Sequence, residues 1–185
     1  MNAPAKTALP GGRFFDTNIL ITTQDPVDGY RRMCALAAVE AAMKADCFVI
    51  STQVMQEFHD FMLHKRWVRP EQSVALLQQL TEHTVVPASS DSVLHAAALQ
   101  QAHGLLFWDA LIVQAALDAR CALLFSEDLE TGRRFPPLQK NDCDLVVVNP
   151  FTANAAGSVW ALHEAPGRYE VALPKRKAKA VPAGN

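Results

Sequence analysis

Short apolar runs alternate along this chain with longer segments in which apolar residues recur every three or four positions. The short runs are typical of buried strands, and the longer periodicity is typical of helices packed on one face. Strands are predicted at the run that leads into Asp16 and at residues 47–50, 84–86, 122–125 and 145–148. Helices are predicted at residues 28–45, 52–67, 69–80, 89–103 and 110–119. This alternation favours an α/β fold in which a parallel sheet carries helices on both faces.

Helix boundaries and apolar faces can be predicted residue by residue. Asp28 and Thr52 are placed to cap the first two helices, and Gly104 is suited to end the fourth. The apolar positions expected to face the core in the first helix are Tyr30, Met33, Cys34, Ala37, Ala38 and Ala41. Those expected in the second helix are Val54, Met55, Phe58, Phe61, Met62 and Trp67, and those in the last are Leu111, Ile112, Ala115 and Ala116.

Four acidic residues occupy corresponding places in this pattern. Asp16 and Asp128 each follow an apolar strand. Glu57 and Asp109 lie near the starts of helices that follow strand regions. The carboxyl ends of parallel strands share one edge of a sheet, where α/β proteins bind ligands. The four carboxylates are therefore expected to meet at that edge.

Each acid also has an ordinary structural interpretation. Asp16 alone is more often an Asx-turn or a helix cap. Glu57 fits an exposed acid near a helix start, and Asp128 with its neighbour Glu127 fits a surface loop. Asp109 fits an N-cap, but it lies among apolar residues where an unpartnered acid is costly to bury. The prediction of a site therefore rests on the set of four.

A cluster of carboxylates without matching Lys or Arg is unfavourable unless a cation compensates it, because like charges raise one another's pKa. All-oxygen ligands suit Mg²⁺ or Mn²⁺. Such ions can hold a phosphodiester and activate water, which favours a nucleic-acid substrate. Thr17, Asn18 and Ser126 are supporting polar candidates at the same edge, although capping and turn formation are commoner uses of such residues.

Length and composition predict one domain with flexible ends. The chain has 185 residues, half of them hydrophobic, which is enough for one sizeable core. Residues 1–12 are expected to be a flexible leader, and residues 151–185 a C-terminal extension with a basic, disordered end. No apolar run is long enough to span a membrane, so a cytoplasmic protein is expected.

Charge and metal-binding motifs narrow the classes of function. The formal net charge of −2 is not that of a constitutive nucleic-acid binder. The four cysteines form no C-x-x-C pair, so free buried thiols are expected rather than a zinc site or a disulfide framework. His59 and His64 are five positions apart and no H-E-x-x-H occurs, which argues against a histidine metal site.

The ordered set of motifs resembles the PIN domain, and most closely the VapC-type toxins of bacterial toxin–antitoxin pairs. The resemblance covers residues 13–150. It is carried by Phe-Phe-Asp-Thr-Asn at 14–18, the helix of Glu57, Phe-Trp-Asp-Ala-Leu-Ile at 107–112 and the segment 124–132. Its sharpest parts are Trp-Asp-Ala-Leu-Ile and Ser-Glu-Asp-Leu.

This resemblance implies a three-layer α/β/α fold with a central, mainly parallel sheet, metal-dependent RNA cleavage, a homodimer and a cognate antitoxin. By motif position, the catalytic acids and metal ligands of the family carry over to Asp16, Glu57, Asp109 and Asp128, with Thr17 or Ser126 as polar helpers. Two departures are the extension beyond residue 149 and the presence of Glu127 beside Asp128, which leaves the fourth ligand open.

Three functions compete at this point. A Mg²⁺-dependent endoribonuclease accounts for the four ordered acids. A catalytically silent module that binds RNA or protein is the second interpretation, motivated by basic residues at 65–66, 69 and 133–134 and near the C-terminus. Phosphotransfer from Asp16 is the third, and Asn18 argues against it because it stands where haloacid-dehalogenase-like enzymes have a second acid.

Overall fold

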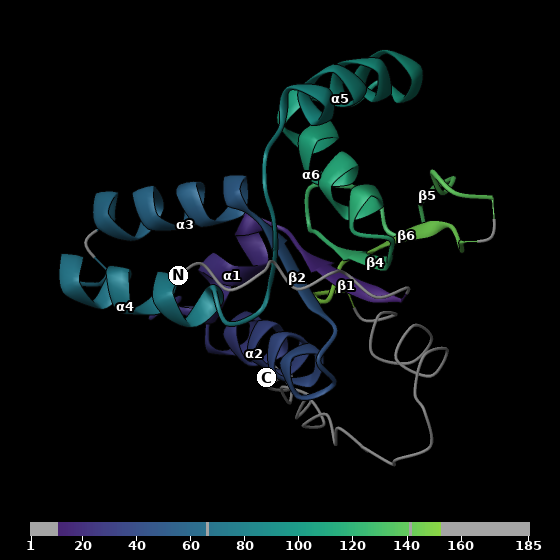
Figure 1. Cartoon of the computed structure of the whole chain (residues 1–185). Helices are drawn as coiled ribbons and strands as arrows, with labels where there is room; N and C mark the ends of the chain where they lie inside the picture. Colours follow the sequence, from purple (N-terminus) through teal and green to yellow (C-terminus); the bar gives the residue numbers. More distant parts are fainter. Residues whose placement is uncertain (1–10, 66, 141, 153–185) are drawn as a thin grey trace, which may run out of the picture.

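The computed structural model describes residues 11–65, 67–140 and 142–152. Its strands are β1 (Gly12–Phe15), β2 (Phe48–Ser51), β3 (Thr84–Val86), β4 (Cys121–Phe125), β5 (Arg134–Phe135) and β6 (Leu145–Val148). Its helices are α1 (Thr17–Thr23), α2 (Gly29–Lys44), α3 (Thr52–His64), α4 (Pro70–Leu80), α5 (Ser90–His103) and α6 (Phe107–Asp118) (Figure 1).

The strands form one six-stranded sheet in the order β3-β2-β1-β4-β6-β5. Every neighbouring pair is parallel except β5 and β6. The predicted mainly parallel sheet is therefore confirmed. The aromatic ring of Phe15, at the end of the central strand β1, stacks on Phe48 and Phe125 of the two flanking strands, with ring centroids 5.0 and 4.7 Å apart. This stack fixes the carboxyl end of β1 beside that of β4, where a site would lie.

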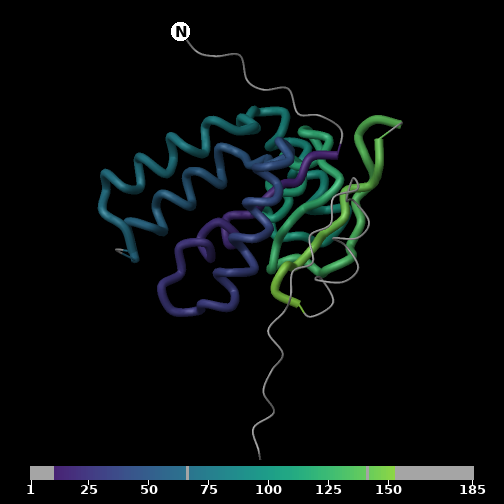
Figure 2. Tube along the Cα trace, turned by 90° about the horizontal axis from the view of Figure 1, so that it is seen from below, coloured from purple at the N-terminus to yellow at the C-terminus, as the bar shows by residue number. Residues whose placement is uncertain are grey.

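Helices cover both faces of the sheet, as predicted. Helix α6 packs on β2 and β4, and α2 packs on β2 from the opposite side (Figure 1). Helices α3 and α4 run side by side and project past the sheet as a pair (Figure 2). In the described part of the chain, no helix has the length and apolar character needed to cross a bilayer.

Several helix ends follow the predicted capping pattern. The side chain of Asp28 accepts a hydrogen bond from the Arg31 amide at 3.0 Å and so caps α2. Gly104 ends α5 with φ of +64°, a backbone region that glycine adopts without the steric cost other residues meet. The predicted strands at 84–86 and 145–148 coincide with β3 and β6.

The predicted apolar face of α2 is wrong except at Ala38. Tyr30 and Met33 are 51% and 49% exposed, and the buried residues are Ala35, Ala38, Val39 and Ala42. Alanines occur all round this helix, so its sequence does not define a unique apolar face. Packing against α1 and β2 selects the face whose small side chains allow close approach.

Other helix boundaries also differ from the predictions. Ser51, rather than Thr52, caps α3, and this helix ends at His64, before Trp67. Helix α6 begins three residues earlier than expected, so Asp109 lies inside its first turn. Helix α1 and strand β5 were not predicted, because seven and two residues are too short to show a reliable period.

The cysteine prediction holds in part. All four thiols are free, but only Cys121 is buried, whereas Cys143 is exposed. Burial raises the pKa of the Cys121 thiol. Of the predicted leader at 1–12 and extension at 151–185, residues 1–10 and 153–185 lie outside the described residues; Gly12 was assigned to the leader but begins β1.

Candidate active site

Asp16 occupies the junction between β1 and α1. Its amide donates to the carbonyl of Phe125 at 2.9 Å and so extends the pairing of β1 with β4 by one residue. One carboxylate oxygen accepts the Thr17 amide at 2.7 Å, and the other accepts the Ser126 hydroxyl at 2.7 Å. The side chain is only 8% exposed. Asp16 therefore is a helix cap, and the same contacts fix both of its oxygens at the edge of the sheet.

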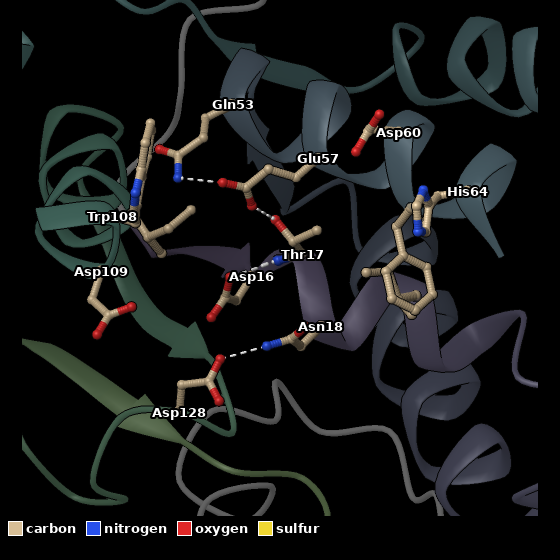
Figure 3. Close-up of a pocket in the computed structure, with 13 residues that line it drawn as sticks. Asp16, Thr17, Asn18, Gln53, Glu57, Asp60, His64, Trp108, Asp109 and Asp128 are labelled. Carbon is tan, nitrogen blue, oxygen red and sulfur yellow. Dashed lines mark hydrogen bonds between the residues drawn. The ribbon is translucent and has the colours of Figure 1, made fainter. Parts of the chain in front are cut away.

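The four predicted acids, Asp16, Glu57, Asp109 and Asp128, line one cavity at this edge (Figure 3). The cavity measures about 430 Å³, within the range of about 300–1,000 Å³ that is usual for ligand sites. The other lining residues are Thr17, Asn18, Ile21, Gln53, Asp60, Phe61, His64, Trp108 and Ile112. The convergence expected from the strand pattern is thus present.

Glu57 is held in place by two neighbours. One carboxylate oxygen accepts the Thr17 hydroxyl at 2.5 Å, and the other accepts the Gln53 amide at 2.9 Å (Figure 3). Gln53 precedes Glu57 by one helical turn on α3, and Thr17 lies in the first turn of α1. Glu57 is therefore an oriented side chain and not a freely solvated acid.

The loop after β4 carries two neighbouring acids, Glu127 and Asp128, and the sequence left open which of them is the fourth ligand. Asp128 lines the cavity and accepts a hydrogen bond from the Asn18 side chain. Glu127 is not among the lining residues and forms an ion pair with Arg31. The Arg31 guanidinium also lies 4.2 Å from the centre of the Phe151 ring. Glu127 thus fastens α2 to this loop, and Asp128 faces the cavity.

Uncompensated negative charge is the main electrostatic feature of the site. The pKa of Asp16 is raised from 3.8 to about 6, chiefly because the carboxyl is buried; the charges of Asp128 and Glu57 also raise it, and hydrogen bonds from Ser126 and Thr17 oppose the rise. The pKa of Asp109 is raised by its burial and then by the same two charges. Among the described lining residues none is Lys or Arg, so a bound cation would stabilise the cluster.

The donor set fits a hydrated divalent cation. In the parts of the chain that the structure describes, no three His, Cys, Asp or Glu side chains are arranged to hold an ion among themselves. Mg²⁺ commonly keeps several of its waters and uses one or two carboxylates together with substrate phosphates. Carboxylates spread round one cavity suit that mode better than a closed, all-protein cage.

Three residues of this region were not identified from the sequence. Gln53 orients Glu57, Asp60 lines the cavity, and Arg31 holds Glu127. Gln53 and Asp60 lie four residues before and three residues after Glu57, on the same helical face, so helical spacing contained the signal for both. Arg31 is far from Glu127 in the sequence, so no local sequence pattern could predict their ion pair.

Comparisons with known proteins bear on the family and the fold of this chain. A family model described as PIN domain matches residues 13–134. A chain of a toxin–antitoxin complex from Klebsiella pneumoniae is 25% identical with a TM-score of 0.52, and the match covers 76% of this chain and 98% of that one. VapC20 of Mycobacterium tuberculosis, described as a sarcin-ricin loop cleaving toxin, is 19% identical with a TM-score of 0.53, covering 63% of this chain and 92% of its own. No curated protein sequence matches significantly.

Proposed function

This chain belongs to the PIN-domain family, and from that premise we propose that it is a divalent-metal-dependent endoribonuclease. The observation that carries the proposal is the convergence of Asp16, Glu57, Asp109 and Asp128 on one cavity with no Lys or Arg among its described lining residues. The similarity to a chain of a toxin–antitoxin complex supports the narrower proposal of a toxin with a cognate antitoxin.

The four acids would hold Mg²⁺ or Mn²⁺ in this proposal. When bound, the ion supplies charge that offsets the carboxylates and the phosphodiester and lowers the pKa of a nucleophilic water. The remaining polar residues keep the acids in place: Ser126 orients Asp16, Asn18 orients Asp128, and Thr17 orients Glu57. Hydrolysis would then break one P–O bond of the RNA backbone and add water across it.

The test is cleavage of total RNA by purified protein with Mg²⁺, with Mn²⁺ and with a chelator, beside an Asp109→Asn variant prepared identically. We expect cleavage only with metal, reduced about 10- to 100-fold in the variant because one charged side chain of the cluster is lost. Equal cleavage by the variant, or cleavage that persists in chelator, would contradict the proposal. If no sample cleaves RNA and binding survives replacement of all four acids, the chain is a binding module.

Thr17→Val is expected to lower kcat/KM about 10- to 100-fold, because loss of a hydrogen bond that orients a ligand side chain usually has that effect. Valine keeps the shape of this buried side chain but cannot donate to Glu57. Thr17→Ser keeps the hydroxyl and is the matched control. Mg²⁺ titrations of the cleavage rate should show a weaker apparent metal affinity for Thr17→Val only.

A homodimer is part of the proposal and follows from family resemblance. Light scattering of the purified chain over a range of concentrations measures the oligomeric state directly. A particle of twice the chain mass is expected.

A further inference from the structure

Trp108 is an exposed tryptophan at the edge of the acidic cavity. Its side chain is 63% exposed, yet it is one of the cavity's lining residues. Large aromatic side chains usually bury most of their surface, because each carries much apolar area. The exposure of Trp108 therefore has a cost in the free protein that contact with a ligand would remove.

The position of Trp108 places its indole beside the reacting region. Trp108 precedes Asp109 in the first turn of α6. The residues Ala110, Ile112 and Val113 that come after them in this helix are buried. In Figure 3, Trp108 and Asp109 are drawn on one side of the cavity and His64 on the other. A chain bound in the cavity would thus meet an aromatic surface at the edge that also carries Asp109.

We propose that Trp108 stacks on an unpaired base of the RNA next to the phosphodiester held by the acids, and so positions the substrate and selects unpaired RNA. This inference rests on the proposed ribonuclease function. Bases in an A-form duplex are stacked on one another and present no free face, whereas bases in loops can be splayed onto aromatic side chains. Loss of one such stack typically weakens binding about 5- to 100-fold.

A protein partner is the other class of ligand that an exposed tryptophan could contact. Two observations favour a base. The indole lines the same cavity as the carboxylates, where a substrate must enter, and Trp108 directly precedes one of these acids, Asp109, in the chain. The same cavity is lined by the four carboxylates and Asp60, whereas the centre of a protein interface is usually depleted of charge.

The experiment measures binding of a labelled single-stranded RNA, and of the same RNA annealed to its complement, in an Asp16→Asn background that slows cleavage. Trp108→Ala should weaken binding of the single strand about 5- to 100-fold and leave duplex binding unchanged. Trp108→Phe should restore most of the affinity. Leu94→Ala is the matched control, because Leu94 is 67% exposed on α5 and is not among the cavity's lining residues.

An abasic scan of the RNA makes the test specific to stacking. One abasic position should weaken binding to the parent protein, and Trp108→Ala should add no further loss with that RNA, because both changes remove the same contact. Equal binding by Trp108→Ala and its parent, or absence of single-strand binding by the parent, would overturn the inference. A change of oligomeric state with unaltered RNA affinity would identify a protein contact instead. The ribonuclease proposal is decided separately, by metal-dependent cleavage.

Discussion

Replacing Asp16 by Asn is expected to lower RNA cleavage about 10²- to 10³-fold, the size of effect seen when a preorganised charge-stabilising group is removed from an active site. Asp16 is the most buried of the four acids, and both of its oxygens are fixed by Ser126 and Thr17. Asparagine keeps the shape of the side chain and one acceptor but carries no charge. The electrostatic contribution to cation and substrate binding is therefore lost while the fold is kept.

Initial rates under saturating Mg²⁺ measure this effect. Asp91→Asn is the control, because Asp91 is an exposed acid in the first turn of α5 and does not line the cavity. Its cleavage rate should match that of the unaltered chain. An Asp16→Asn protein that retains more than about a tenth of the rate would exclude a central role for this carboxylate.

The same substitution is expected to stabilise the folded protein at neutral pH in the absence of metal. The pKa of Asp16 is 3.8 in its ordinary state and about 6 in the fold. Below pH 3.8 the carboxyl is protonated in both the folded and the unfolded chain, so its ionisation does not reduce the free energy of unfolding. As pH rises from about 4 to about 6, the unfolded chain gives up the proton and the folded chain keeps it. The free energy of unfolding then falls by roughly 3 kcal/mol from this group alone.

Asparagine does not ionise, so it avoids this loss. It cannot accept both of the hydrogen bonds that Asp16 accepts, and this loss lowers the free energy of unfolding by about 1 kcal/mol. The expected net gain for Asp16→Asn is therefore about 2 kcal/mol at pH 7.5, shrinking towards zero or below as the pH approaches 4.

Urea unfolding between pH 4 and pH 8 in chelator measures the difference between the two proteins. Asp91→Asn is again the control and should show no pH-dependent difference from the unaltered chain. Added Mg²⁺ should raise the free energy of unfolding of the unaltered chain more than that of Asp16→Asn, because a ligand that binds the folded state stabilises it by mass action. A variant that is less stable at pH 7.5, or a gain that grows towards pH 4, would show that Asp16 is not under electrostatic strain.

The substitution Asp16→Asn would thus lower the cleavage rate and raise the free energy of unfolding. Such opposition is common where a site keeps charges together for function. In this chain the cause is local, since Asp16 is buried beside the charges of Asp128 and Glu57.

The main elements of the fold were predictable because their signals are local. Strands β3 and β6 coincide with short apolar runs, and the caps at Asp28 and Gly104 use side-chain chemistry that acts within one turn. Placement of Asp16 and Asp128 after strands followed from the same pattern, but the expectation that the helix of Asp109 follows a strand was wrong, because α6 follows α5 directly. The family resemblance is confirmed by the match over residues 13–134. The catalytic roles of Asp16, Glu57, Asp109 and Asp128 stay predictions.

The buried face of α2 and the start of α6 were decided by packing. Alanines round α2 left several faces equally apolar, and contact with α1 and β2 selected one of them. Leu106 makes no side-chain cap of α6, so the sequence carried no signal for the earlier start of this helix. Asp109 consequently lies within a helical turn, beside the exposed ring of Trp108.

The sequence by itself determined which acids stand at the ends of strands, because strand period and chain direction are properties of neighbouring residues. Only the tertiary structure decided which oxygens face the cavity. Ser126 and Asp16 are 110 positions apart, as are Asn18 and Asp128, and Thr17 meets Glu57 across 40 positions. These contacts, and the ion pair that turns Glu127 towards Arg31, form only when separate elements pack together. Side-chain orientation across such distances is set by packing and charge in three dimensions, which no local pattern records.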